Sequence, residues 1–297
     1  MKFALEMPTA GATTDPAAIK LMAQAADQAG FELVGYTDHP APSRKWLDHG
    51  GHSTFDPFAA LSFVAAVTER VGLMTFLAVL PYRNPLLLAK SVATVDLLSG
   101  GRFTLVAGTG YLRSEFAALG RSFEDRNELF DEAVTVLRGA FSAAAFEFEG
   151  RDFTALGVAL DPPPVQRPHP PIWVGGNSMA SRRRVARFGA GWAPVRSDPT
   201  FSKTMRTGVL ATDDDFAAAI DGLREMVSAE GRDPDQVGVM LDGGPRLEDP
   251  SDYALERAGQ LAGIGATHLM VHAPSGEPAQ IAEHLERFGR EVIAPAG

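Results

Sequence analysis

Short apolar runs alternate with helical stretches along the whole of this 297-residue chain. Eight such runs can be counted, and each precedes a segment whose apolar residues recur with helical spacing. The third run, residues 73–80, is almost wholly apolar, which is typical of a strand buried on both faces. The alternation predicts parallel strands, because each helix returns the chain to the edge where the next strand starts.

The ends of these segments can also be predicted. The strands cover residues 3–7, 31–37, 73–80, 103–107, 172–174, 192–195, 237–241 and 268–271. Three helices begin at Asp15-Pro16, Asp56-Pro57 and Asn84-Pro85. An Asp or Asn followed by proline is a strong start signal, because the side chain accepts from a free backbone amide and proline fits the first helical position.

Parallel strands joined by helices close into a barrel or open into a doubly wound sheet. The chain length, the count of eight and the absence of Gly-x-Gly-x-x-Gly after the first strand favour one (β/α)8 TIM barrel over residues 1–297. Two segments leave the rhythm: 141–171, which alternates like a hairpin and then carries six prolines, and the polar stretch 196–212. We expect both to be insertions at the C-terminal face, with 141–171 laid across the barrel mouth.

Composition excludes several classes of function. The net charge of −10 argues against non-specific nucleic-acid binding, and no apolar stretch approaches the ~18 residues of a membrane helix. The absence of cysteine excludes disulfides and thiolate metal sites. Because no secretory signal opens the chain, we expect a cytoplasmic protein. We also expect a small-molecule substrate and a homodimer.

In such a barrel the chemistry lies on the loops that follow the strands. Asp38-His39 follows the second strand, where the carboxylate could bind a ligand while the imidazole transfers a proton near neutral pH. An equally consistent interpretation is that Asp38 caps the loop before Pro40 and that His39 is simply half-buried.

Two glycine-containing turns, Gly108-Thr109-Gly110 and Gly175-Gly176-Asn177-Ser178, follow the fourth and fifth strands. Glycines let a backbone approach a ligand, and a helix N-terminus favours phosphate. Each turn alone is also explained by turn geometry, but two on neighbouring strands favour a cofactor that carries phosphate.

Metal binding is the rival chemistry. His49 and His52 lie three residues apart in a loop, whereas His268 and His272 on a strand would lie roughly 13 Å apart, too far to share one ion. No His-x-His follows the first strand, so we predict no metal site. The sequence contains no Gly-x-Ser-x-Gly motif, so it does not indicate a serine hydrolase.

Several strings over about residues 1–195 resemble the luciferase-like monooxygenase superfamily, in its branch of coenzyme F420-dependent oxidoreductases. They are Thr37-Asp38-His39, Asp56-Pro57-Phe58, Thr68-Glu69-Arg70-Val71-Gly72-Leu73, Leu80-Pro81-Tyr82-Arg83-Asn84-Pro85, Asp96-Leu97-Leu98-Ser99-Gly100-Gly101-Arg102-Phe103 and Pro164-Val165-Gln166-Arg167-Pro168-His169-Pro170-Pro171-Ile172-Trp173-Val174-Gly175-Gly176-Asn177. The Ser-Gly-Gly-Arg and Gln-Arg-Pro-His-Pro-Pro-Ile-Trp-Val-Gly-Gly strings together are highly specific.

The resemblance implies coenzyme F420, with FMN as the alternative, lying in the barrel mouth against a bulge in the third strand. In relatives this bulge contains a non-prolyl cis peptide, which matches the region Met74-Thr75-Phe76. The implied cofactor contacts are Asp38, Thr75, Phe76, Thr109, Gly110, Ser114, Gly175, Gly176, Asn177 and Ser178, the last four at the phosphate. His39 matches the proton-transferring histidine of sugar-phosphate dehydrogenases in the family.

The chain departs from those dehydrogenases at two positions. Tyr111 stands where they carry an acid, and Ser114 stands where they usually carry Asn. A hexose-phosphate substrate is therefore not indicated. We expect hydride transfer between F420 and a small organic substrate, with His39 as general acid/base and Tyr111 lining the site. The alternatives are an FMN-dependent monooxygenase and a non-catalytic flavin-binding barrel.

Overall fold

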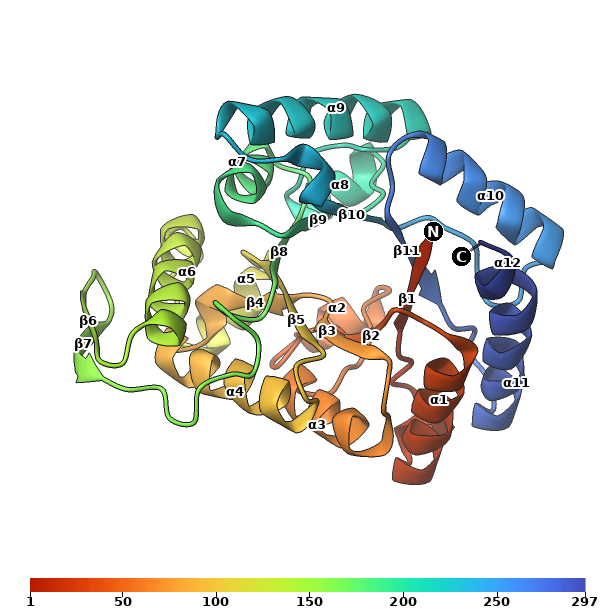
Figure 1. Cartoon of the computed structure of the whole chain (residues 1–297), viewed down its shortest axis with the longest axis horizontal. Coiled ribbons are helices and arrows are strands. Elements are labelled where there is room, and N and C mark those ends of the chain that lie inside the picture. Colours follow the sequence, from red (N-terminus) through yellow and green to blue (C-terminus); the bar gives the residue numbers. More distant parts are fainter. Residues whose placement is uncertain (297) are drawn as a thin grey trace.

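In the computed structural model, which describes residues 1–296, nine strands run parallel around one ring (Figure 1). They are β1 (Lys2–Glu6), β2 (Leu33–Tyr36), β3 (Gly72–Thr75), β4 (Ala78–Val79), β5 (Phe103–Gly108), β8 (Ile172–Gly175), β9 (Gly191–Ala193), β10 (Gly238–Leu241) and β11 (His268–His272). Their order is β3-β2-β1-β11-β10-β9-β8-β5-β4, and a pairing of β3 with β5 closes the ring. Because β3 and β4 are two parts of one interrupted strand, the predicted (β/α)8 barrel is confirmed.

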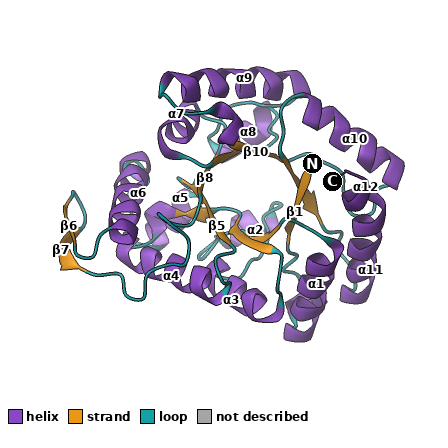
Figure 2. Ribbon diagram, viewed as in Figure 1, coloured by secondary structure: helices purple, strands orange, loops and turns teal. Residues whose placement is uncertain are grey.

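Helices surround the ring, as Figure 2 shows. The long ones are α1 (Pro16–Ala29), α3 (Pro57–Val67), α4 (Pro85–Leu98), α6 (Arg126–Ser142), α7 (Met179–Phe188), α9 (Asp213–Ala229), α10 (Ser251–Gly263) and α11 (Pro278–Phe288). The short ones are α2 (Arg44–Asp48), α5 (Arg113–Ala118), α8 (Pro199–Met205) and α12 (Ala294–Ala296). The predicted start signals are confirmed, since Asp15, Asp56 and Asn84 each accept a hydrogen bond from a first-turn amide. Among residues 1–296, no helix has the length and apolar character needed to span a membrane.

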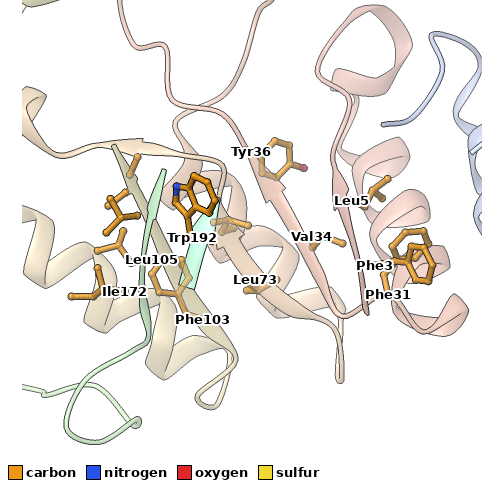
Figure 3. Packing of buried hydrophobic residues seen from close by; sticks show 14 of the residues in the cluster. Phe3, Leu5, Phe31, Val34, Tyr36, Leu73, Phe103, Leu105, Ile172 and Trp192 are labelled. Carbon is orange, nitrogen blue, oxygen red and sulfur yellow. The ribbon is translucent and has the colours of Figure 1, made fainter. Parts of the chain in front are cut away.

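Successive side chains along the barrel strands belong alternately to two apolar clusters. One face of each strand packs outward against the helices; Phe103, Leu105 and Trp192 belong to this cluster and are labelled in Figure 3. The other face fills the barrel with one residue from each of eight strands: Ala4, Leu33, Met74, Val106, Trp173, Ala193, Met240 and Met270. This inner cluster fixes which residues face the two ends of the barrel.

The third strand is interrupted as the resemblance implies. A cis peptide joins Phe76 to Leu77, just past the region 74–76 where we expected it. Both side chains pack on the inner cluster, so the interruption lies at the carboxyl end of the barrel interior.

The segment 141–171 does form a hairpin, β6 (Phe146–Glu149) and β7 (Thr154–Val158), but the expectation that it crosses the mouth is wrong. Arg151 in the hairpin turn pairs with Asp125 and Glu128 near the start of α6, and Figure 1 shows the hairpin outside that helix. Gln166 then donates to Asp96 and to the carbonyl at the start of β5, which is the amino end of the barrel. The segment connects the end of α6 to the start of β8, and both of these lie at the amino end.

The second insertion, 196–212, does lie at the carboxyl end. It follows β9, contains α8, and is joined by a backbone pairing of Ser197 with Leu210. The loop 40–55 after β2 carries α2 at the same end. These two loops, and not 141–171, therefore border the barrel mouth.

Candidate functional site

Side-chain alternation defines the walls of the carboxyl-end opening. Glu6, Asp242 and His272 each stand two residues after a member of the inner cluster, so all three point into the opening from neighbouring strands β1, β10 and β11. Gly108 and Gly175 occupy the same level on β5 and β8, across the ring. The opening thus has a charged wall, formed by Glu6, Asp242 and His272. Across from it, the wall at Gly108 and Gly175 has no side chains at this level.

Leu77 lies against the two glycines. A Cβ atom at Gly108 would lie 2.4 Å from Leu77 Cδ1, and one at Gly175 would lie 2.2 Å from Leu77 Cδ2. Both glycines are therefore needed for Leu77 to pack down onto the wall. With the half-buried Phe76 beside it, Leu77 forms an apolar floor that fits a flat ring system. Gly175 belongs to this floor, whereas the family resemblance implied that it contacts the phosphate.

His39 is placed by a buried carboxylate that sequence reasoning missed. Its Nδ1 lies 3.1 Å from Oε2 of Glu115, which is completely buried. The same oxygen accepts a hydrogen bond of 2.9 Å from the Tyr82 hydroxyl, and Oε1 accepts from the Ala41 amide. With Nδ1 committed to Glu115, Nε2 is the nitrogen available for proton transfer.

Aromatic rings enclose the His39 imidazole. The Trp46 ring centroid lies 4.5 Å from that of His39, the His52 centroid 5.1 Å and the Tyr111 centroid 5.9 Å. Burial and the Glu115 charge raise the pKa of Tyr111 to about 12, and burial and His39 lower the pKa of His52. The structure thus brings His39 and Tyr111 together, whereas His49 is exposed and bonds to the Lys45 carbonyl.

Asp38 is directed into the protein wall. Its carboxylate pairs with the Arg83 guanidinium through both oxygens and also accepts from the Val79 amide at 2.9 Å. Burial raises the pKa of the Asp38 carboxyl, while Arg83 and Val79 oppose that shift. This geometry fits a residue that fixes the β2 and β4 ends beside the floor better than one that contacts a cofactor ring.

The turn after β8 serves mainly to hold the 196–212 loop. The Asn177 amide group donates to the carbonyls of Val195 and Gly208 and accepts from the Val195 amide. Ser178 caps α7 through the Ser181 amide, and Gly176 has a left-handed φ of 96°. The side chains of Asn177 and Ser178 are thus engaged, which leaves backbone groups as the route to a phosphate.

The remaining predicted contacts differ in exposure. Thr75 is completely buried and donates to the Val106 carbonyl, which does not fit a cofactor contact. Thr109 and Gly110 are half-buried at the end of β5, and Ser114 is exposed on α5. Gly110 has a φ of 76°, and a Cβ there would lie 2.6 Å from Val79 Cγ1, so the turn requires glycine.

Three arginines surround one phenyl ring near Ser114, and sequence reasoning did not find them. The guanidinium carbons of Arg113, Arg126 and Arg206 lie 4.2, 4.1 and 5.0 Å from the centroid of Phe123. Burial lowers the pKa of Arg126; Glu124, which pairs with Arg113 at 2.7 Å, opposes this, and the charges of Arg206 and Arg113 lower the pKa further. Such mutually repelling cations fit an anionic group, for example a cofactor phosphate. Only the fold reveals this arginine cluster, because Arg206, which directly follows α8, lies 80 residues from Arg126 in the sequence.

No group of three or more His, Asp or Glu side chains in residues 1–296 is arranged to hold a metal ion. The groups that fit a ligand here are an apolar floor, a buried histidine–carboxylate pair and the arginine cluster. Together they fit a flat ring with an anionic end.

Comparison with known proteins places this geometry in context. A sequence model of the family described as luciferase-like monooxygenase matches residues 1–296. The chain is 31% identical over 219 residues to an F420-dependent hydroxymycolic acid dehydrogenase of Mycobacterium tuberculosis, an alignment that covers 73% of this chain and 55% of that protein. It is 27% identical over 317 residues to an F420-dependent glucose-6-phosphate dehydrogenase of Beutenbergia cavernae, with 90% of each chain covered.

An FMN-using relative is also similar. The chain is 29% identical over 169 residues to an FMNH(2)-dependent dimethylsulfone monooxygenase of Pseudomonas putida, which covers 56% of this chain and 45% of that protein. Among solved structures, a monooxygenase from Streptomyces bottropensis superposes with a TM-score of 0.80 at 23% identity, with 100% of both chains covered. Relatives of this fold therefore use either cofactor.

Proposed function

The chain belongs to the luciferase-like monooxygenase family, and on that premise we propose that it transfers a hydride between coenzyme F420 and a small organic substrate. The observation that carries the proposal is the buried pair of His39 and Glu115 beside the Leu77 floor. F420 has carbon where a flavin has N5, so when bound it supplies two-electron hydride chemistry. The F420-dependent relatives support the choice of cofactor.

The residues of the chain have separate tasks in this proposal. Leu77 and Phe76 support the cofactor ring. The arginine cluster of Arg113, Arg126 and Arg206 holds the phosphate. Glu115 fixes the tautomer of His39, so that Nε2 takes the proton from a substrate hydroxyl as the hydride leaves, or returns it in the reverse direction. Trp46 and Tyr111 exclude water from the imidazole.

An FMN-dependent monooxygenase is the second candidate, favoured by the similarity to the dimethylsulfone monooxygenase. Equilibrium titration of the protein with F420 and with FMN, followed by ring fluorescence, separates the two. We expect F420 to bind at least about tenfold more tightly than FMN, a difference of about 1.4 kcal/mol. Preferential binding of FMN would replace the proposal with the monooxygenase.

A further inference from the structure

The charged wall of the opening is not used by the proposed function. His272 Nδ1 lies 2.9 Å from Oε2 of Glu6, and its Nε2 lies 2.9 Å from Oδ1 of Asp242. Glu6 and His272 are register partners on β1 and β11, and Asp242 follows the adjacent strand β10. The three side chains therefore stand on rigid strand ends, opposite Leu77.

This Glu6–His272–Asp242 cluster offers only acceptors. Both ring nitrogens of His272 are engaged by carboxylates, so the imidazolium has no N–H left to donate. Oε1 of Glu6 and Oδ2 of Asp242 accept no hydrogen bond from residues 1–296. The side chains of Glu6 and Asp242 are 24% and 23% exposed, so a ligand in the opening can reach them.

The charge of the cluster also selects its ligand. Burial lowers the pKa of His272, but hydrogen bonds and charges from Asp242 and Glu6 outweigh this and raise the pKa to about 10. At neutral pH one imidazolium stands between two carboxylates, which gives a net charge of −1. The charge of Arg196 also lowers the pKa of Asp242, but the Arg196 guanidinium is paired with Asp213 at 2.6 Å.

We propose that the Glu6–His272–Asp242 cluster is a substrate subsite that binds a protonated amine and rejects carboxylate and phosphate groups. An acceptor-only site of net negative charge stabilises N–H donors, most strongly charged ones, and repels anions. This inference deepens the proposed function and rests on it, because it names the class of substrate that enters the same opening. The amine lies at the β1–β10–β11 wall, while the reacting carbon faces the Leu77 floor.

Three probes of similar size test the subsite: 4-aminobutan-2-ol, 4-methoxybutan-2-ol and 3-hydroxybutanoate. Their dissociation constants are measured at pH 7.5 by protein NMR titration, with and without F420, so that no turnover is needed. We expect the amine to bind roughly tenfold or more tightly than the ether, and the carboxylate to bind least. Equal affinities for amine and ether would overturn the proposal, whereas failure of F420 to bind would overturn only the proposed function.

Variants test which side chains cause the preference for the amine over the ether. Glu6→Gln and Asp242→Asn should each lower the amine-to-ether preference several-fold, and either one suffices if the other does not fold. His272→Gln should raise it, because two carboxylates then stand without their cation. The matched control is Glu32→Gln, which removes one carboxylate at the amino end, where Glu32 pairs with Lys2 at 2.6 Å. An unchanged preference in both carboxylate variants, or an equal loss in the control, would contradict the subsite.

Discussion

At the scale of residues, the candidate site depends on charges that are buried together. His39 gains its orientation from Glu115, which also accepts hydrogen bonds from the Tyr82 hydroxyl and the Ala41 amide. Removing one member of such a network costs more than the pair contributes, because the partner is left buried and unpaired. Function at His39 is therefore inseparable from residues that never touch a substrate.

The arginine cluster should bind the anionic end of the cofactor. Arg126→Gln should weaken F420 binding about tenfold and reduce the salt dependence of that binding, since one charge-assisted contact is lost. The melting temperature of the free protein should stay the same or rise, because repulsion from Arg113 and Arg206 is relieved. Fluorescence titrations over a salt series measure the first effect, and Arg290→Gln, which changes an exposed arginine that pairs with Glu286, is the control. Unaltered affinity in Arg126→Gln would place the phosphate elsewhere.

His272 should give the protein a pH-dependent stability. Its pKa is raised from 6.5 to about 10 on folding, so its contribution is fully present below about pH 6.5 and is lost as the pH rises through about 10. The urea midpoint of the parent should therefore fall more steeply between about pH 7 and pH 10 than that of His272→Gln. Parallel slopes for the two proteins would show that the imidazolium is not held by Glu6 and Asp242.

At the scale of elements, the interruption between β3 and β4 shapes the Leu77 floor, on which we propose that the cofactor ring lies. Gly175→Ala should weaken cofactor binding roughly tenfold or more, because the new Cβ would lie 2.2 Å from Leu77 and drive that side chain into the opening. Gly259→Ala on α10 has no atom within 4 Å of the new Cβ and serves as the control. If both variants bind F420 like the parent, the ring does not rest on Leu77.

The elements themselves were largely predictable, and their pairings in space were not. Periodicity and Asp-Pro or Asn-Pro starts located the strands and helices within a few residues, because those signals are local. The most specific strings of the resemblance lie partly at the amino end, where Gln166 donates hydrogen bonds to the buried Asp96. Glu115 lies 76 residues from His39, and no local pattern marks such a distant partner. The 141–171 segment was misplaced because its proline-rich sequence does not indicate which end of the barrel it crosses.

At the scale of the whole molecule, the barrel divides the work between its two ends. The amino end carries hydrogen bonds between connecting segments, such as those of Gln166 with Asp96. The carboxyl end carries the Leu77 floor, the histidine–carboxylate pair and the charged wall. Because strand ends are rigid, these groups keep their spacing without a ligand. The expected homodimer stays a prediction, which sedimentation of the free protein would check.

The most direct test of hydride transfer to F420, with His39 as the general base, is an anaerobic reaction of the F420-loaded protein with a panel of small secondary alcohols, followed by loss of deazaflavin absorbance. We predict absorbance loss without oxygen for at least one alcohol, and roughly 10²–10⁴-fold slower loss in His39→Ala with F420 affinity unchanged. His49→Ala, which alters an exposed histidine of the same loop, should react like the parent. Turnover only with FMN and oxygen, or full activity in His39→Ala, would contradict the account.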